Sequence, residues 1–175
     1  MDMDIDLITK AKEYADQAHS AVGQVRKYTN DPYITHPAAV AHLVGLVTDD
    51  PHMIAAAWLH DTLEDTDVTY SDLVRDFGPD VADLVRQVTD VSVPSDGDRK
   101  TRKALDWAHL AKASPRAMTI KLADIIDNTR SIAGHDQAFA RIYMAEKRAL
   151  LSALDAGSVA LLGAAYSIVG GRYAA

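Results

Sequence analysis

The sequence predicts an all-helical fold, a single bundle of eight to nine helices over residues 1–175. Two observations support this prediction. Apolar residues recur at helical spacing along almost the whole chain, whereas the alternation typical of strands is nearly absent. Cap residues, glycines and prolines then divide the chain into short segments. A chain of this length can bury a substantial core as one domain, and it contains no internal repeat.

Five helices are expected in the first half, over residues 5–22, 37 to about 49, 51–59, 70–77 and 81–88. Pro37 and Pro51 suit first turns, where a missing N–H costs nothing. Thr69 and Asp72 have the spacing of a capping box. Gly78 is expected to end the fourth helix.

Four more helices are expected in the second half, over about 98–113, 115–134, 139–154 and 158–169. The stretch 91–97, rich in Ser, Pro, Asp and Gly, is interpreted as a surface loop inside the domain. Asp124 interrupts an apolar segment of the seventh helix. An aspartate in that setting is expected to face inward and to need a partner.

Composition excludes several classes of protein. The chain has no cysteine, so it has no disulfide, thiolate zinc site or cysteine nucleophile. A net charge of −7 argues against broad nucleic-acid binding. No apolar run approaches the ~20 residues of a membrane span, and the acidic N-terminus does not resemble a signal peptide. We therefore expect a cytoplasmic protein that binds neither nucleic acid nor membrane.

The chemistry is predicted to centre on His60 and Asp61, which follow the apolar segment 53–59. Burying such a pair is costly unless it is paired or bound to a metal. Asp124 and His36 are the expected further ligands, which would give a site of two histidines and two aspartates. Such donors suit manganese, iron, zinc or magnesium.

Glu64 and Asp65 lie four residues after His60 and Asp61, so a continuous helix would place them one turn further on the same face. We expect them to transfer protons rather than to bind the metal. The remaining histidines (His19, His42, His52, His109 and His135) are interpreted as surface or loop residues without a link to the cluster.

In these residues the sequence resembles the hydrolase domain of the RelA/SpoT type, within the HD-domain phosphohydrolases. The resemblance spans most of the chain. It is carried by Gly23-Gln24-Val25-Arg26-Lys27, Pro32-Tyr33-Ile34-Thr35-His36-Pro37, Leu59-His60-Asp61-Thr62-Leu63-Glu64-Asp65-Thr66, Phe77-Gly78, Lys121-Leu122-Ala123-Asp124 and Asn128.

The resemblance implies a helical Mn²⁺ enzyme that hydrolyses (p)ppGpp to GDP or GTP and pyrophosphate. It assigns the metal to His36, His60, Asp61 and Asp124, and proton transfer to Glu64 and Asp65. It also implies that substrate contacts come from Arg26, Lys27, Asn128, Arg99, Arg102, Lys103 and Tyr143.

Two departures concern substrate preference. Ile125 follows the predicted ligand Asp124 where many long members have arginine, and the interval between His19 and Arg26 is slightly expanded. Because the chain ends at Ala175, without the further domains of long members, it is expected to be a stand-alone small alarmone hydrolase.

Two alternatives remain open. The same metal site would suit (p)ppApp or the 2′-phosphate of NADPH. A protein of another class would bind nucleotide or neutralise a synthetase without catalysis, although the Glu64–Asp65 pair argues against this.

Overall fold

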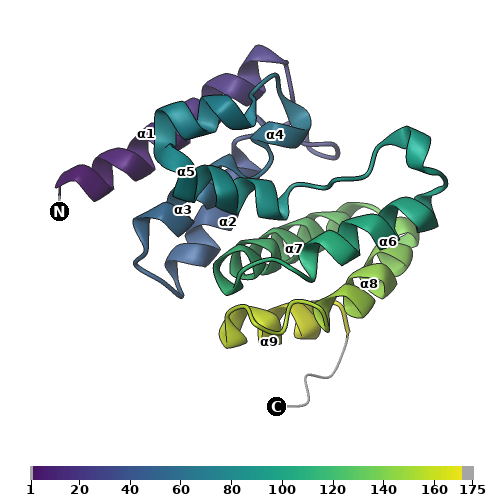
Figure 1. Cartoon of the computed structure of the whole chain (residues 1–175). Helices are drawn as coiled ribbons and strands as arrows, with labels where there is room; N and C mark the ends of the chain where they lie inside the picture. The colour runs from purple at the N-terminus through teal and green to yellow at the C-terminus, as the bar shows by residue number, and fades with distance from the viewer. Residues whose placement is uncertain (1, 171–175) are drawn as a thin grey trace.

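The computed structural model describes residues 2–170, and its regular structure there is helical apart from one isolated bridge between Val25 and Pro32 (Figure 1). The α-helices of this range are α1 (Asp2–Ala21), α2 (Thr35–Gly45), α3 (Pro51–Leu59), α4 (Thr62–Asp65), α5 (Tyr70–Val88), α6 (Arg99–Leu110), α7 (Pro115–His135), α8 (Gln137–Leu151) and α9 (Val159–Ile168). Because α4 is a single turn, eight helices are longer than one turn, which confirms the all-helical prediction.

Several predicted helix boundaries have the expected local chemistry. Thr69 and Asp72 form a reciprocal capping box at the start of α5. Gly78, with φ +84°, breaks α5 into the two helices that the sequence predicts. The second helix ends at Gly45, about four residues earlier than predicted, because Leu46 N–H closes its last turn on His42 and Leu43.

Helix α7 joins two groups of helices (Figure 1). It packs against α2, α3 and α5 on one side and against α8 and α9 on the other. Ile120, Leu122, Ile125 and Ile126 of α7 are fully buried, so this helix supplies much of the core. Ile125, which departs from the family pattern, is therefore a core residue. Because α7 lies between these two groups of helices, its polar residues, such as Asp124, lie where the groups meet.

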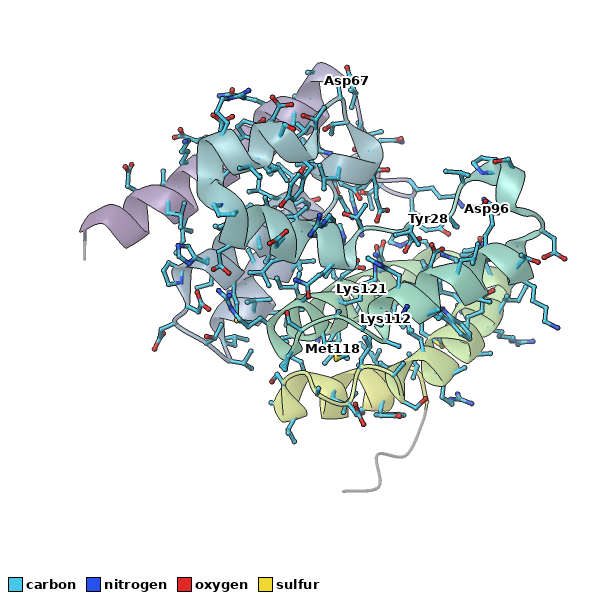
Figure 2. The ribbon with its side chains drawn as sticks, viewed as in Figure 1. Tyr28, Asp67, Asp96, Lys112, Met118 and Lys121 are labelled. Atoms are coloured by element: carbon cyan, nitrogen blue, oxygen red, sulfur yellow. The ribbon has the colours of Figure 1, made fainter. Side chains whose placement is uncertain are left out.

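The predicted surface loop connects α5 to α6 and extends away from the body of the molecule (Figure 1). It contains a short 3-10 turn, η1 (Pro94–Asp96), and Asp96 lies at its outer part in Figure 2. The buried Asp106 carboxylate of α6 holds the loop, because it accepts hydrogen bonds from the backbone N–H groups of Val91 and Ser92.

Among residues 2–170, no helix combines the length and the apolar composition that crossing a membrane requires.

Candidate active site

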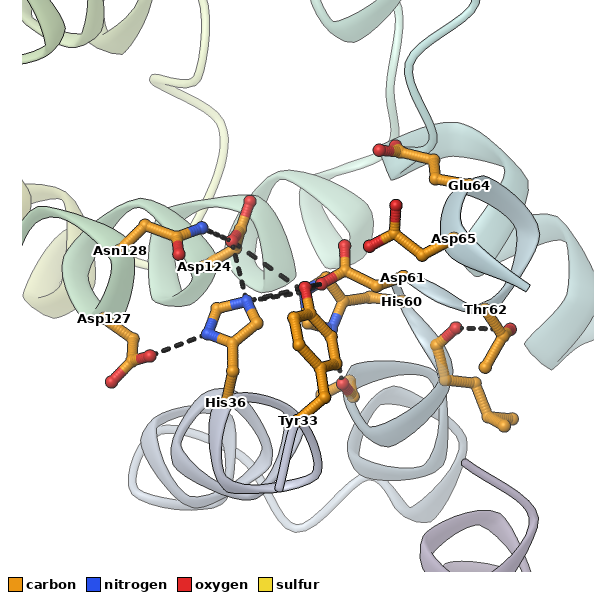
Figure 3. A network of polar contacts seen from close by, with 12 residues as sticks. Tyr33, His36, His60, Asp61, Thr62, Glu64, Asp65, Asp124, Asp127 and Asn128 are labelled. Atoms are coloured by element: carbon orange, nitrogen blue, oxygen red, sulfur yellow. Dashed lines mark hydrogen bonds and ion pairs between the residues drawn. The ribbon is translucent and has the colours of Figure 1, made fainter. Parts of the chain in front are cut away.

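His36, His60 and Asp124 come from three separate segments and form a candidate metal site (Figure 3). His36 lies in the first turn of α2, His60 directly follows α3, and Asp124 lies in the middle of α7. All three are buried. The Nε2 atoms of the two imidazoles are 3.2 Å apart, and Asp124 Oδ1 is 3.2 Å from His36 Nε2 and 3.8 Å from His60 Nε2.

The outer nitrogen of each imidazole has its own partner. His36 Nδ1 lies 2.6 Å from Asp127 Oδ2, and His60 Nδ1 lies 2.9 Å from the carbonyl of Ala57. These acceptors require that Nδ1 carries the proton, so in a neutral ring the Nε2 lone pair is free. Both lone pairs then point into the same small space, which is the usual arrangement of histidine ligands.

Asp61 completes the set of four predicted ligands. Its Oδ2 is 3.1 Å from His60 Nε2 and 3.4 Å from His36 Nε2, and it accepts a hydrogen bond of 2.6 Å from the Tyr33 hydroxyl. Asp124 is held by Asn128 at 2.6 Å and by Lys121 at 2.9 Å. Lys121 itself lies near the centre of the molecule (Figure 2).

Donor atoms of His36, His60 and Asp124 lie close enough together to bind one ion, and Asp61 Oδ2 borders both imidazoles. Atoms about 2.1–2.2 Å from a common ion, at tetrahedral or octahedral angles, lie roughly 3.0–3.6 Å from one another. Four of the five separations given above fall in this range, and the fifth exceeds it slightly. The residues present therefore fit a divalent cation bound by nitrogen and oxygen.

Nearby carboxylates favour the protonated form of both imidazoles. Burial lowers the pKa of His36, but the hydrogen bonds to Asp124, Asp127 and Asp61 outweigh it and raise the pKa to about 11. The same balance raises the pKa of His60 to about 9. Against the cost of burial, the histidines hold the pKa of Asp61 well below its usual range.

The structure corrects the predicted continuity of the helix through His60. Helix α3 ends at Leu59, residues 60 and 61 form a turn, and Glu64 and Asp65 lie on the separate short helix α4. The Thr62 hydroxyl donates to the Leu59 carbonyl at 2.7 Å, the group that Leu63 N–H would reach in a continuous helix. Glu64 and Asp65 nevertheless extend toward the side on which Asp61 lies (Figure 3).

Glu64 is exposed on one side, and on the other it lies near the charged groups of Asp90, Asp61 and Lys121. Its carboxylate accepts a hydrogen bond of 2.6 Å from the backbone N–H of Asp90, at the end of α5. Desolvation of its inner side raises its pKa to about 7, and the negative charges of Asp90 and Asp61 add to the shift, although Lys121 opposes it. A carboxylate of this kind can accept a proton near neutral pH.

Three predicted substrate residues lie together beside the metal site. Arg26, Lys27 and Asn128 line a cavity of about 270 Å³ whose other walls include Tyr28, Tyr33 and Phe139. Arg26 also pairs with Asp127 at 3.4 Å, and Lys27 lies over the rings of Tyr28 and Phe139. A cavity with basic and aromatic walls suits a planar base joined to phosphates.

The other predicted substrate residues are more dispersed. Arg99 and Lys103 line a second cavity of about 410 Å³ between α6 and α8, and Arg99 pairs with Glu146 there. Lys103 pairs with Asp90 at 3.2 Å, and Arg102 Nε is buried without a hydrogen-bond partner among the described residues.

Tyr143 lies on α8, where its ring is near that of Phe139. Burial and the negative charge of Asp124 raise its pKa. Lys147, one turn further along α8, lies over the Tyr143 ring, and burial together with Lys121 lowers the pKa of Lys147 to about 8. Arg99 and Lys103 of α6 and Lys147 of α8 thus place three cations on these two helices.

Four residues of the site are missed by sequence reasoning. They are Gln24, Tyr33, Lys121 and Asp127, each of which hydrogen-bonds or pairs with a predicted site residue. Helical spacing is a signal for Lys121 and Asp127, which stand three residues from Asp124 on α7 and therefore share its face. Gln24, Tyr33 and Lys121 also lie within the blocks that carry the resemblance.

The interpretation of His19 as a surface residue is wrong. It is 1% exposed, its Nδ1 lies 2.6 Å from Gln24 Oε1, and its ring packs against that of Tyr33. Nothing in its local sequence separates it from an exposed helix-end histidine. Its burial depends on the return of residues 24–33 over the end of α1.

The chain is similar to known proteins that share one domain family. A profile of the HD domain matches residues 11–157. Guanosine-3′,5′-bis(diphosphate) 3′-pyrophosphohydrolase MESH1 of Drosophila melanogaster is 41% identical over 104 residues, 58% of this chain and 56% of that protein. The Xenopus tropicalis MESH1 protein is 37% identical over 137 residues, 75% of this chain and 73% of its own length.

Longer relatives match over only part of their length. The Aquifex aeolicus guanosine-3′,5′-bis(diphosphate) 3′-pyrophosphohydrolase is 38% identical over 71% of this chain, which spans 18% of that protein. A solved structure described as a metazoan ortholog of SpoT that hydrolyses ppGpp has a TM-score of 0.83 at 31% identity, covering 93% of each chain.

Proposed function

The chain belongs to the HD-domain family, and we propose that it is a Mn²⁺-dependent hydrolase that removes the 3′-pyrophosphate of (p)ppGpp. The observation that carries the proposal is the pair of facing Nε2 atoms of His36 and His60, bordered by Asp61 and Asp124. The substrate assignment is supported by relatives that are named for this activity, one of which the chain covers over most of its length.

The metal would be held by His36, His60, Asp61 and Asp124. With neutral imidazoles and two carboxylates, this donor set offsets the charge of one divalent ion. When bound, such an ion supplies Lewis acidity at phosphorus and lowers the pKa of a coordinated water. Asp127 and Ala57 keep both Nε2 atoms available, because they accept the Nδ1 protons.

The cavity beside the metal site would hold the nucleoside. Arg26 offers a planar guanidinium to the base, and Lys27 offers a charge to the phosphates. Asn128 lines the same cavity and also donates to Asp124. It would therefore contact the nucleotide and one metal ligand at the same time. The cations of α6, α7 and α8 are suited to the 3′-pyrophosphate and its charge.

In the proposed reaction the oxygen of water forms a bond to the phosphorus attached to the 3′-oxygen, and the bond between that phosphorus and the 3′-oxygen breaks. The products are GDP or GTP, with a free 3′-hydroxyl, and pyrophosphate. Glu64 and Asp65 take the proton that water loses and return one to the 3′-oxygen. The raised pKa of Glu64, about 7, suits it to this exchange near neutral pH.

A direct comparison of substrates tests the proposal. Purified protein with Mn²⁺ is given ppGpp, ppApp and NADPH in separate reactions, and the products are resolved by ion-exchange chromatography. We expect equal amounts of GDP and pyrophosphate from ppGpp. Turnover of ppApp or NADPH with ppGpp left intact would contradict the substrate assignment, and tight binding of ppGpp without turnover would contradict catalysis.

Variants locate the reaction at this site. Asp61→Ala is expected to lose bound metal and activity together. The matched control is Asp67→Ala, which removes an exposed carboxylate six residues further along the chain and should leave both unchanged. Equal activity of Asp61→Ala and Asp67→Ala would place the reaction elsewhere on the protein.

A further inference from the structure

A chain of hydrogen bonds connects a buried histidine to the proposed catalytic carboxylate Asp65. His19 Nδ1 lies 2.6 Å from Gln24 Oε1, and Gln24 Nε2 donates to Asp65 Oδ2 at 2.9 Å. His19 is at the end of α1, Gln24 is in the loop that follows, and Asp65 ends α4. Three segments thus meet through one amide side chain.

The direction of this chain is determined by its ends. The Asp65 carboxylate can only accept, so the amide of Gln24 must point its NH₂ group toward Asp65 and its oxygen toward His19. His19 must therefore donate from Nδ1. Its Nε2 is buried and has no partner among the described residues, and burial lowers the pKa of His19. The ring is therefore neutral with its proton on Nδ1.

Backbone hydrogen bonds also hold Gln24 in place. Gln24 N–H donates to the His19 carbonyl at 3.0 Å, and Gly23 N–H donates to Ser20. Gly23 has φ +67°, a conformation that permits the chain to reverse directly after α1. The slightly expanded interval between His19 and Arg26 therefore leaves Gln24 in contact with His19.

Asp65 has one side exposed to solvent, so a substrate can reach it. A carboxylate on a one-turn helix has few local contacts that would hold its rotamer, and Gln24 supplies the side-chain hydrogen bond that the structure gives it. An unpartnered Nε2 in a buried ring costs free energy. An apolar side chain would avoid this cost, so we infer that the imidazole is present for the hydrogen bond that its Nδ1–H donates to Gln24.

We propose that His19 and Gln24 are positioning residues that hold the Asp65 carboxylate in its reactive orientation, an inference that rests on the proposed function. His19 is buried and is not among the residues that line the cavity proposed for the nucleoside, whereas Gln24 is one of them. His19 fixes the amide of Gln24, and the amide fixes Asp65. Loss of either contact lets Asp65 rotate away from the reacting water, which lowers kcat and leaves the metal ligands in place.

The test measures kcat and KM for ppGpp with Mn²⁺ together with metal content. Gln24→Leu is expected to lower kcat by roughly 10- to 100-fold, since small displacements of a reacting group have effects of this size. In His19→Leu, whose side chain is not part of the cavity lining, KM should change less than about threefold, and metal content should not change in either variant. The matched control is Gln87→Leu, which removes an amide whose hydrogen bonds go to Asp83 and Ser114 and join α5 to the start of α7. It should keep the wild-type kcat.

Rescue separates positioning from folding. His19→Asn retains a side-chain N–H donor near the position of Nδ1, whereas His19→Leu does not. We expect His19→Asn to recover most of the kcat that His19→Leu loses. If Gln24→Leu and both His19 variants turned over ppGpp at the wild-type rate, the inference would be overturned.

A double variant shows whether Gln24 acts through Asp65. In an Asp65→Ala background, Gln24→Leu should lower kcat no further, because the group that it positions is gone. A further loss as large as in the wild-type background would contradict the inference. An inactive wild-type protein would instead overturn the proposed function, and with it the catalytic role that Gln24 serves.

Discussion

The Nε2 atoms of His36 and His60 face each other at a distance of 3.2 Å in a space from which water is largely excluded. Two lone pairs at that separation repel each other, so the arrangement needs positive charge between or upon the rings. Protons supply it when no metal is present, and a divalent cation can replace them. Metal binding and proton binding at this site are therefore competitive.

The metal-free protein should lose stability as the pH rises above about 6.5. The folded-state pKa values of His36 and His60, about 11 and about 9, exceed the unfolded value of 6.5. A raised pKa stabilises the fold fully below the unfolded value, and that stability is lost through the folded value. In EDTA, Tm measured by calorimetry should fall by roughly 10 °C or more between pH 6.5 and 9.5. A flat Tm across that range would contradict the assignment, and with saturating Mn²⁺ the fall should disappear.

Glu64→Gln should retain metal and lose turnover. We expect kcat to fall by roughly 100-fold or more, the usual contribution of a proton-transferring group. In the wild-type protein kcat/KM should decrease below about pH 7, because Glu64, with its pKa of about 7, is then protonated. Asp90→Asn removes a negative charge that raises this pKa, so the acid limb should move to lower pH. An acid limb that stays in place in Asp90→Asn would argue that another group titrates.

Asp127→Asn should weaken metal binding without removing a ligand. The Asp127 carboxylate accepts from His36 Nδ1 at 2.6 Å and so maintains the ring orientation and proton position. Loss of such outer partners typically costs about 10- to 100-fold in metal affinity. Titration of Mn²⁺ by calorimetry measures the effect. Asp83→Asn, on the surface of α5, is the control and should bind Mn²⁺ as the wild type does; equal affinities for the two variants would rule out a supporting role for Asp127.

Gly157→Ala should destabilise the contact between α7 and the segment that leads into α9. An added Cβ at Gly157 would lie 2.8 Å from Leu122 Cδ1 and 3.2 Å from the backbone of Met118 and Thr119. Overpacking of this kind costs about 1–3 kcal/mol, measurable by urea denaturation. Gly163→Ala is the matched control, because a Cβ there meets no atom within 4 Å and Gly163 lies inside α9. It should be neutral or stabilising by about 0.5–1 kcal/mol; equal loss in both variants would contradict the packing argument.

The positions of the helices could be predicted from the sequence alone, and so could His36, His60 and Asp124, which the structure brings together. Helical periodicity and caps are local, so the capping box at Thr69 and the break at Gly78 could be predicted without knowledge of the fold. His60 and Asp124 were recognisable because a charged group within an apolar helix has to be compensated. These inferences need only the residues within a few turns of each position.

Only the tertiary structure decided which distant side chains support the site. Gln24 and Asp65 are 41 residues apart, and His36 and Asp127 are 91 residues apart. Whether such residues meet depends on how α1, α2 and α4 pack around α7, which no local pattern encodes. The burial of His19 and the break between α3 and α4 have the same origin. The local sequence determined the helices and which buried polar groups need a partner. The packing of the helices determined which side chains are those partners.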